Sequence, residues 1–502
     1  MKTCDLLIRN AWVIDGTGAP GRPADVAVRN ARIEAVGTLP DYEGHTCIDA
    51  EGKALAPGFI DVHTHDDQVL LSNPLLPNKI SQGVTTVITG NCGFSLAPVD
   101  IRATEGRAWP MSFGLLGARE GYAFPDFAGY LDALEASPSA VNAGVLVGHS
   151  ALRYGAMDRL DREATADETA RMCEAMEKCM EAGALGLSSG LHYPPAKASA
   201  TEEVIEIARV VGRHGGIYTT HMRNEADDID PSIEEALRIG REGDVPVQIS
   251  HHKLIDARNH GRSVETLERI ERAREEQTVA IDVYPYNAGS TVLDPGRCDG
   301  RYKVIVTWST PFPEMAGRTV ADIAEEWGVD GVEAGRRLLP AGAIYFMLSE
   351  DDVQRILSRP YAMIGSDGLP HDERAHPRLW GTFPRVLGHY CRDLGLFPLE
   401  EAVRRMTSLA AESFGLKDRG VIRPGAWADL TLFDPGTVID RADYQNVDGV
   451  SDGILMVVVN GETVWQNGKP TGNRPGRVLR RQGRIGHGLH RQNRRPAGLP
   501  AR

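Results

Sequence analysis

The chain has 502 residues, 42% of them hydrophobic, and a mean hydropathy of -0.27, which suits one large α/β domain with appendages or several small domains. No run of about 18 apolar residues could cross a membrane, and Gly and Pro follow no strict period, which excludes multi-spanning and collagen-like proteins. The 55 Lys and Arg against 69 Asp and Glu give a net charge of -14, which argues against nucleic acid as the main partner.

Seven scattered cysteines are an odd number and do not form a disulfide framework, so a reducing compartment is expected. The first residues carry an acid at Asp5 and only three consecutive aliphatic residues, and no signal peptide is visible. We therefore expect a cytoplasmic protein whose partner is a small molecule, with neither nucleic acid nor a membrane bound. The last 34 residues hold ten Lys and Arg and no acid, and we expect residues 482–502 to form a basic, disordered tail.

Short apolar runs separated by turn residues fill residues 1–56, and similar runs return at residues 429–433 and 454–459. Such runs are typical of short strands joined by tight turns. The sequence predicts that residues 1–56 and 416–481 pair into one small β-sandwich domain.

Between these ends, eight short apolar runs alternate with helical stretches. The runs end at residues 61–65, 87–92, 145–149, 185–189, 217–221, 247–251, 280–284 and 363–367. Helical periodicity is clearest at residues 165–182, 201–214, 231–242, 264–276 and 398–414. This alternation predicts an α/β fold in which residues 57–415 form a (β/α)8 TIM-like barrel. Residues 287–358 are too long for an ordinary connection and are expected to form an inserted lid subdomain over the barrel mouth.

Metal-binding residue types stand at the ends of several runs, where barrel enzymes place their catalytic groups. They are His63 and His65, Cys92, His221, His251 and Asp367. Residues two apart on a strand share a face, so His63 and His65 can bind one ion together. Either the histidines or the lone cysteine could be ordinary buried residues, but the whole set favours a metal site. A thiolate among imidazoles favours zinc over magnesium or calcium.

Asp367 precedes a glycine and could merely shape a turn. Beside a metal, its carboxylate could instead accept the proton of an attacking water and return it to a leaving nitrogen.

These motifs together resemble the amidohydrolase superfamily and, within it, the D-aminoacylases (N-acyl-D-amino-acid deacylases). The resemblance runs from about residue 1 to residue 481. It is carried by residues 56–65, 83–94, 220–224, 249–253 and 282–286, and above all by the long block at residues 363–385.

The resemblance implies one tight zinc site made by Cys92, His221 and His251. It implies a second, weaker metal position made by His63, His65 and Asp367, whose use in turnover stays open. Many superfamily members bridge two metals with a carboxylated lysine after the fourth strand. Residues 188–193 contain no lysine, which fits the D-aminoacylases and speaks against a hydantoinase.

The same resemblance implies that Lys253, Tyr284, Ser290 and Arg378 bind the α-carboxylate of the substrate. Charged and hydroxyl donors of this kind suit a planar anion. Tyr193 is implied to donate a hydrogen bond to the scissile carbonyl oxygen. Arg297 lies where D-glutamate-preferring relatives hold a substrate side chain, but a similar arginine occurs in relatives that prefer apolar side chains, so it does not fix specificity.

We expect zinc-dependent hydrolysis of N-acyl-D-amino acids to a carboxylate and a free D-amino acid. One alternative is a hydantoinase-like hydrolase of cyclic amides. Another is a non-catalytic scaffold with this fold, although a scaffold should have lost metal ligands. The sequence leaves open the preferred side chain and acyl group, the number of metals, and whether the chain is a monomer or a small homo-oligomer.

Overall fold

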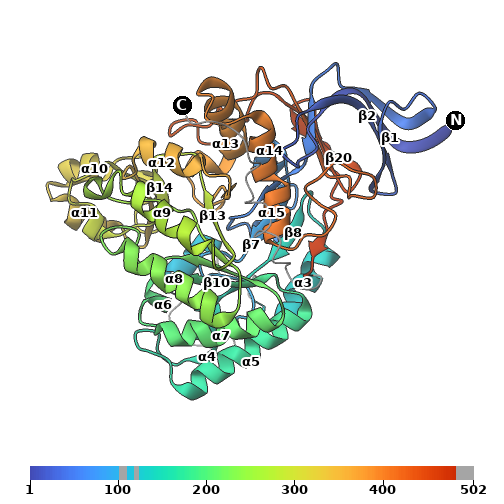
Figure 1. The fold of residues 1–502 in the computed structure, drawn as a ribbon. Coiled ribbons are helices and arrows are strands. Elements are labelled where there is room, and N and C mark those ends of the chain that lie inside the picture. The colour runs from blue at the N-terminus through green and yellow to red at the C-terminus, as the bar shows by residue number, and fades with distance from the viewer. Residues whose placement is uncertain (101–109, 118–123, 482–502) are drawn as a thin grey trace, which may run out of the picture.

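The computed structural model describes residues 1–100, 110–117 and 124–481 (Figure 1). The tail expected at residues 482–502 lies outside the described residues. Within those ranges, no helix is both long and apolar enough to cross a bilayer. All seven cysteines are free thiols, as their number and spacing predict.

Both chain ends contribute to one nine-stranded sheet, as the short apolar runs predict. Its strands are β1 (Lys2–Val13), β2 (Arg22–Arg29), β3 (Arg32–Gly37), β4 (Tyr42–Asp49), β5 (Ala54–Pro57), β18 (Leu430–Phe433), β19 (Ile454–Val459), β20 (Glu462–Gln466) and β21 (Lys469–Pro470). The two ends meet where β18 pairs antiparallel with β5, with Leu432 opposite Leu55. One apolar cluster of this sheet contains Val26 and Val458, and a smaller cluster contains Leu7 and Tyr42.

A strand is present at each of the eight expected runs, and the third run is divided in two at Leu146. These strands are β6 (Phe59–Asp61), β7 (Val84–Thr89), β8 (Asn142–Val145), β9 (Val147–Gly148), β10 (Gly186–Gly190), β11 (Ile217–His221), β12 (Val247–Ile249), β13 (Val279–Val283) and β17 (Ala362–Ile364). Neighbouring strands pair in parallel in the orders β8-β7-β6 and β17-β13-β12-β11-β10-β9. A parallel bridge between Thr64 and Gly368 links the ends that follow β6 and β17. A short strand, β22 (Val478–Leu479), adds to β8.

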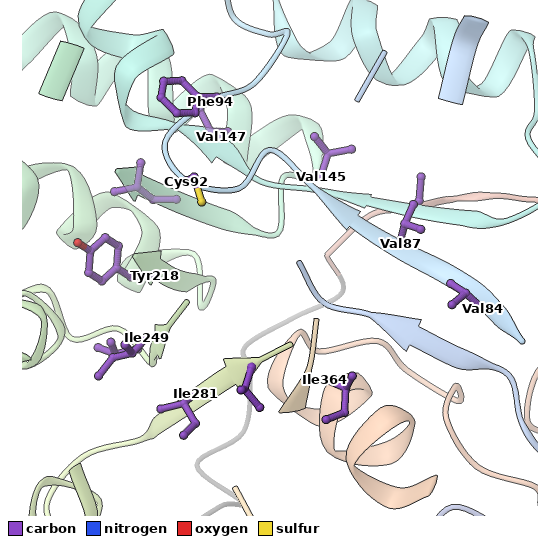
Figure 2. Packing of buried hydrophobic residues seen from close by; sticks show 14 of the residues in the cluster. Val84, Val87, Cys92, Phe94, Val145, Val147, Tyr218, Ile249, Ile281 and Ile364 are labelled. Carbon is purple, nitrogen blue, oxygen red and sulfur yellow. The ribbon is translucent and has the colours of Figure 1, made fainter. Parts of the chain in front are cut away.

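Successive residues of these strands enter two different apolar clusters, because side chains alternate along a strand. Val87 and Ile281 pack in the larger cluster, which includes many helix residues, and Figure 2 shows them on their strands. Their neighbours Ile88 and Ala280 pack in the other cluster, together with Leu409. The strands are thus buried on both faces, which explains why they appear in the sequence as continuous apolar runs.

Helices lie between the strands along the chain. They are α1 (Val69–Ser72), α2 (Pro77–Ile80), α3 (Phe127–Ala136), α4 (His149–Ala156), α5 (Ala166–Ala182), α6 (Pro194–Lys197), α7 (Thr201–Arg213), α8 (Ile229–Gly243), α9 (Ser263–Ala273), α12 (Glu350–Leu357), α13 (Arg378–Arg385), α14 (Leu399–Met406) and α15 (Ser408–Ser413). Helix α5 shows how particular residues fix the two ends of a helix. Thr165 and Glu168 form a capping box at its start, and Gly183 follows its end with a φ of 106°.

The helical periodicity at residues 398–414 is confirmed, but the chain forms two helices there, α14 and α15, with a break at Thr407. The backbone of Thr407 has φ -134° and ψ -90°, which is outside the helical region. The Thr407 hydroxyl donates to the Val403 carbonyl, and Gly420 packs directly against the Thr407 backbone. Contacts with a distant segment therefore override an apolar pattern that continues through the break.

The segment expected as an insertion contains a separate three-stranded antiparallel sheet of β14 (Gly289–Val292), β15 (Val304–Ser309) and β16 (Ala341–Tyr345). Helices α10 (Val320–Trp327) and α11 (Gly331–Leu338) pack against this sheet, and their apolar residues share one cluster with it. In Figure 1, α10 and α11 lie on the side of the molecule opposite β1 and β2. The insertion thus brings its own core to the strand ends that carry the metal-binding residue types.

Candidate active site

Six buried side chains of metal-binding type converge at the carboxyl ends of the parallel strands. His63 and His65 follow β6, Cys92 follows β7, His221 ends β11, His251 follows β12, and Asp367 follows β17. They form two groups that share Cys92: one with His63, His65 and Asp367, the other with His221 and His251. Within each group the ligand atoms all lie within 4.8 Å of one another.

The distances around Cys92 suit a zinc ion. Its Sγ lies 3.2 Å from His63 Nε2, 3.4 Å from His251 Nε2 and 3.8 Å from His221 Nδ1. A sulfur and a nitrogen bound to one tetrahedral zinc are separated by roughly 3.6 Å, given ordinary bond lengths. These residues therefore fit a zinc ion by both donor type and spacing.

The charges of this cluster favour bound cations. Burial would raise the pKa of the Cys92 thiol, but His63 and His251 lower this pKa well below its usual value. Burial would also raise the pKa of Asp367, but Arg378 and His63 lower this pKa well below its usual value. A thiolate and a carboxylate in one buried cluster are the forms that bind zinc.

Three of the six residues have a left-handed backbone, which non-glycine residues seldom adopt. The φ angles are 54° at Cys92, 35° at His251 and 50° at Asp367. The surrounding structure holds these turns in place: the His251 amide donates to Asp282 Oδ1 at 2.8 Å, and the Asp367 amide donates to the His63 carbonyl at 2.8 Å. Such strain is typical of residues fixed for a functional geometry.

Two buried carboxylates that the sequence motifs do not indicate, Asp282 and Glu225, lie behind the histidines. Asp282 Oδ1 lies 3.3 Å from His63 Nδ1. Glu225 Oε1 lies 3.1 Å from His251 Nδ1, and Glu225 Oε2 lies 3.6 Å from His221 Nε2. A carboxylate on the far nitrogen of an imidazole orients the ring and makes it a better metal ligand. The only sequence signal for Glu225 is its place four residues after His221.

Four of the six residues, His65, His221, His251 and Asp367, line a pocket of about 550 Å³, open space at its mouth included. Lys253, Tyr284, Ser290 and Arg378, the four residues expected to bind the substrate carboxylate, all line it, as do Tyr193 and Arg297. Apolar side chains that the sequence did not single out complete the lining: Leu115, Ile255, Met347 and Leu369.

Arg378 and Tyr284 present buried donors to this pocket. Arg378 is 1% exposed, and its Nη2 donates to the Ser290 carbonyl at 3.0 Å. Within the described part of the chain, neither Arg378 Nε nor Tyr284 Oη has a hydrogen-bond partner. The Arg378 guanidinium carbon lies 4.7 Å from the centroid of the Tyr284 ring. Unpartnered buried donors beside a cation suit an anionic ligand group.

The other two residues of this set already have protein partners. Lys253 Nζ lies 2.7 Å from Glu225 Oε1 and 2.7 Å from His251 Nδ1. Ser290 Oγ donates to the Ala343 carbonyl at 3.4 Å. Lys253 therefore connects the pocket wall to a metal-binding histidine.

Tyr193 and Arg297 contact histidines of the pocket. The ring centroids of Tyr193 and His221 are 4.8 Å apart, and Tyr193 Oη lies 3.0 Å from Thr291 Oγ1. Burial raises the pKa of Tyr193 well above its usual value, so its hydroxyl is a stable donor. Arg297 Nη2 lies 3.3 Å from His192 Nε2. Burial, with His221 and Arg297 nearby, lowers the pKa of His192 to about 3.

Residues 46–288 and 299–465 match the amidohydrolase family. Among curated proteins from Alcaligenes xylosoxydans xylosoxydans, a D-aminoacylase is 54% identical over 95% of this chain and 98% of its own length. An N-acyl-D-aspartate deacylase is 48% identical over 95% of each chain. An N-acyl-D-glutamate deacylase is 45% identical over 96% of this chain and 97% of its own length.

Solved structures of a D-aminoacylase and of an N-acyl-D-glutamate deacylase are also similar to this chain. A D-aminoacylase crystal structure is 52% identical and superposes with a TM-score of 0.92, covering 95% of this chain and all of that one. An N-acyl-D-glutamate deacylase from Bordetella bronchiseptica, solved with zinc and a phosphonate mimic of the tetrahedral intermediate, has 47% identity and a TM-score of 0.92 over the same shares. An L-hydantoinase from Arthrobacter aurescens has 16% identity and a TM-score of 0.60, which shows a shared fold alone.

Proposed function

The chain belongs to the amidohydrolase family, and from this premise we propose that it hydrolyses N-acyl-D-amino acids to a carboxylate and a free D-amino acid, with zinc as its metal. The observation that carries the proposal is that four residues of the donor set, His65, His221, His251 and Asp367, line the same pocket as Arg378 and Tyr284, which hold unpartnered buried donors. Such a pocket can hold an acyl group at the metal and a carboxylate at Arg378.

Cys92, His221 and His251 would hold the tight zinc, and His63, His65 and Asp367 the second, weaker one. When bound, zinc lowers the pKa of a water molecule and polarises a carbonyl oxygen. The relative solved with zinc supports this choice of metal, as does the thiolate donor.

Asp367 accepts the proton of the attacking water in this scheme. Its lowered pKa keeps the carboxylate ionised, so it can act as a base. Once protonated beside Arg378, Asp367 is a strong acid and returns the proton to the departing amine nitrogen. The Tyr193 hydroxyl stays protonated and donates to the carbonyl oxygen as negative charge develops there.

Arg378 and Tyr284 bind the α-carboxylate of the substrate, with Ser290 and Lys253 beside them. Because the carboxylate and the acyl carbon are both fixed, only one configuration at the α-carbon directs its side chain into free space. An L-amino acid would direct the same side chain at the pocket wall. Arg297 and the apolar side chains of Ile255 and Met347 both line the pocket, so the preferred side chain stays open.

A cyclic-amide hydrolase is less well supported. No lysine occurs in β10 or in the three residues after it, where a hydantoinase would carry its bridging carboxylated lysine. A scaffold without activity is also disfavoured, because all six metal-binding residues are present and converge.

The same proposal includes a finer architecture. The eight parallel strands form one closed (β/α)8 barrel, which the bridge between Thr64 and Gly368 supports. Residues 1–56 and 416–481 form a β-sandwich, which the two separate apolar clusters of their sheet support. Residues 287–358 act as a lid, since this segment contributes Ser290, Arg297 and Met347 to the pocket. A cytoplasmic location stays a prediction.

The test is release of free amine from paired N-acetyl-D- and N-acetyl-L-amino acids (Met, Leu, Phe, Glu and Asp) by the zinc-loaded protein. We expect hydrolysis of D-substrates alone, abolished in Cys92→Ala. Cys179→Ala is the matched control, because Cys179 is an equally buried thiol on α5 and belongs to neither metal group. No hydrolysis of any N-acyl-D-amino acid would contradict the proposal and make cyclic amides the next substrates to test.

A further inference from the structure

Lys79, on α2, has a fully buried ammonium group with three partners. Its Nζ lies 2.8 Å from Asp61 Oδ2, 3.0 Å from Ser366 Oγ and 3.2 Å from Asp66 Oδ2. The sequence pattern gives no reason to expect this, since α2 is a four-residue helix outside every motif.

Each partner of Lys79 is close in the chain to a residue of one metal group. Asp61 precedes His63 by two residues, Asp66 directly follows His65, and Ser366 directly precedes Asp367. These residues belong to two strand ends about 300 positions apart in the sequence, so the ammonium group joins the end of β6 to the end of β17.

Backbone hydrogen bonds extend this junction to the metal-binding residues. Asp61 Oδ1 accepts from the Ser366 amide at 2.8 Å and faces the His63 amide at 3.4 Å. The Asp367 amide donates to the His63 carbonyl at 2.8 Å. A shift of Asp61 or Ser366 would therefore move the backbone from which His63 and Asp367 extend.

The positive charge is required for this arrangement. Asp61 and Asp66 are both fully buried, and buried carboxylates are costly unless a cation pairs with them. Burial would lower the pKa of the Lys79 ammonium, but Asp61 and Asp66 raise it above its usual value, so the group stays charged. An apolar residue in its place would leave two carboxylates unpaired beside the metal centre.

The other half of the centre depends on different groups. His221 and His251 are backed by Glu225, and the His251 amide is held by Asp282. Lys79 contacts neither of these carboxylates in the structure. Asp282 also lies 3.3 Å from His63 Nδ1 and so contacts both halves of the centre, whereas Lys79 contacts only the segments beside His63, His65 and Asp367.

We propose that Lys79 is a positioning residue that holds His63, His65 and Asp367 in the arrangement needed to bind the second, weaker zinc. The proposal rests on the proposed function, because it takes the two-site division of the zinc ligands from it.

The experiment is a calorimetric titration of zinc alone into chelator-stripped full-length protein, wild type and Lys79→Met. Methionine matches the length of lysine without its charge. For Lys79→Met we expect the first zinc to bind as in the wild type and the second to bind about 10- to 100-fold more weakly. Circular dichroism and Tm of each protein establish that it is folded.

Arg153→Met is the matched control. Arg153 is another fully buried cation, paired with Glu203 through Nη1 at 2.7 Å, and it lies outside both metal groups. We expect a lower Tm and unchanged affinities for both zinc ions. A loss of stability alone, without a change in zinc binding, would thus be recognised as purely structural.

If Lys79→Met does not fold, Ser366→Ala serves instead, because it removes one acceptor of Lys79 and leaves the ion pair with Asp61. We then expect the second zinc to bind about 3- to 10-fold more weakly. The proposal is overturned if the second affinity of the folded variant equals that of the wild type, if both affinities fall equally, or if the wild type binds only one zinc. No substrate is present in this titration, so its outcome is independent of whether the chain hydrolyses N-acyl-D-amino acids.

Discussion

Arg378 Nη1 lies 2.9 Å from Asp367 Oδ2, so the cation assigned to the substrate carboxylate also contacts the carboxylate assigned to proton transfer. The contact lowers the pKa of Asp367, and Arg378 Nε is buried without a hydrogen-bond partner among the described residues. Under the proposed assignment, substrate binding and the base strength of Asp367 are coupled through one guanidinium group.

Arg378→Lys should separate charge from geometry. Lysine keeps the positive charge but lacks the planar fork that binds a carboxylate through two nitrogens. We expect KM for an N-acetyl-D-amino acid to rise about 10- to 100-fold, since hydrogen bonds to charged groups contribute about 1.5–3 kcal/mol. Steady-state kinetics measure this. Arg385→Lys, on the same helix but paired with Asp440, should leave KM unchanged. An unaltered KM in Arg378→Lys would refute the assignment.

Tyr193→Phe removes one hydroxyl and little else. If this hydroxyl stabilises charge on the carbonyl oxygen, kcat should fall about 100-fold or more while KM changes little. Tyr218→Phe is the control, because its buried hydroxyl contacts Ser189 Oγ at 2.7 Å and the residue does not line the pocket. A fall in kcat that is equal in both variants would show a general packing effect instead.

The strands and metal-binding residues could be predicted from the sequence because both depend on local pattern. Strands buried on two faces give continuous apolar runs, and parallel strands place the residues that follow them at one edge. His63 and His65 could therefore be grouped with Cys92 and Asp367 without any knowledge of distances.

The roles of Glu225, Asp282 and Lys79 could not be predicted, because they depend on contacts between distant segments. A buried acid beside an apolar run has no periodicity that distinguishes it from an acid in a turn. The partner of Lys253 could not be predicted for the same reason, because its ammonium group contacts Glu225, which is 28 residues away in the chain. The break at Thr407 likewise lies against Gly420, and the helical periodicity of residues 398–414 does not indicate this contact.

Glu225→Gln tests the support of the tight zinc site. The carboxylate faces both His221 and His251, and an amide would present a weaker acceptor and a competing donor to them. We expect the affinity for the first zinc to fall about 10- to 100-fold, measured by competition with a chelator. Glu235→Gln is the control, since Glu235 pairs with Arg223 at 2.8 Å outside both metal groups. Equal affinity in Glu225→Gln and the wild type would show that the carboxylate does not support the tight site.

The buried ion pair between α4 and α7 should make stability depend on acid pH. Burial alone would raise the pKa of Glu203, but His149 and Arg153 lower it from 4.5 to about 2. Because the folded-state pKa lies below the unfolded one, the pair stabilises the fold fully above about pH 4.5, and this stabilisation is lost as the pH falls toward 2. The shift corresponds to roughly 3 kcal/mol.

Glu203→Gln has no carboxylate to titrate and leaves Arg153 unpaired. We therefore expect its Tm to lie well below that of the wild type at pH 7 and the difference to narrow between pH 5 and pH 3, measured by thermal unfolding. Glu202→Gln, one residue earlier and 67% exposed in its pair with Arg238, should change Tm little at any of these pH values. A Tm difference that stays constant from pH 7 to pH 3 would show that Glu203 keeps an ordinary pKa in the folded protein and that the α4 to α7 contact is held by packing instead.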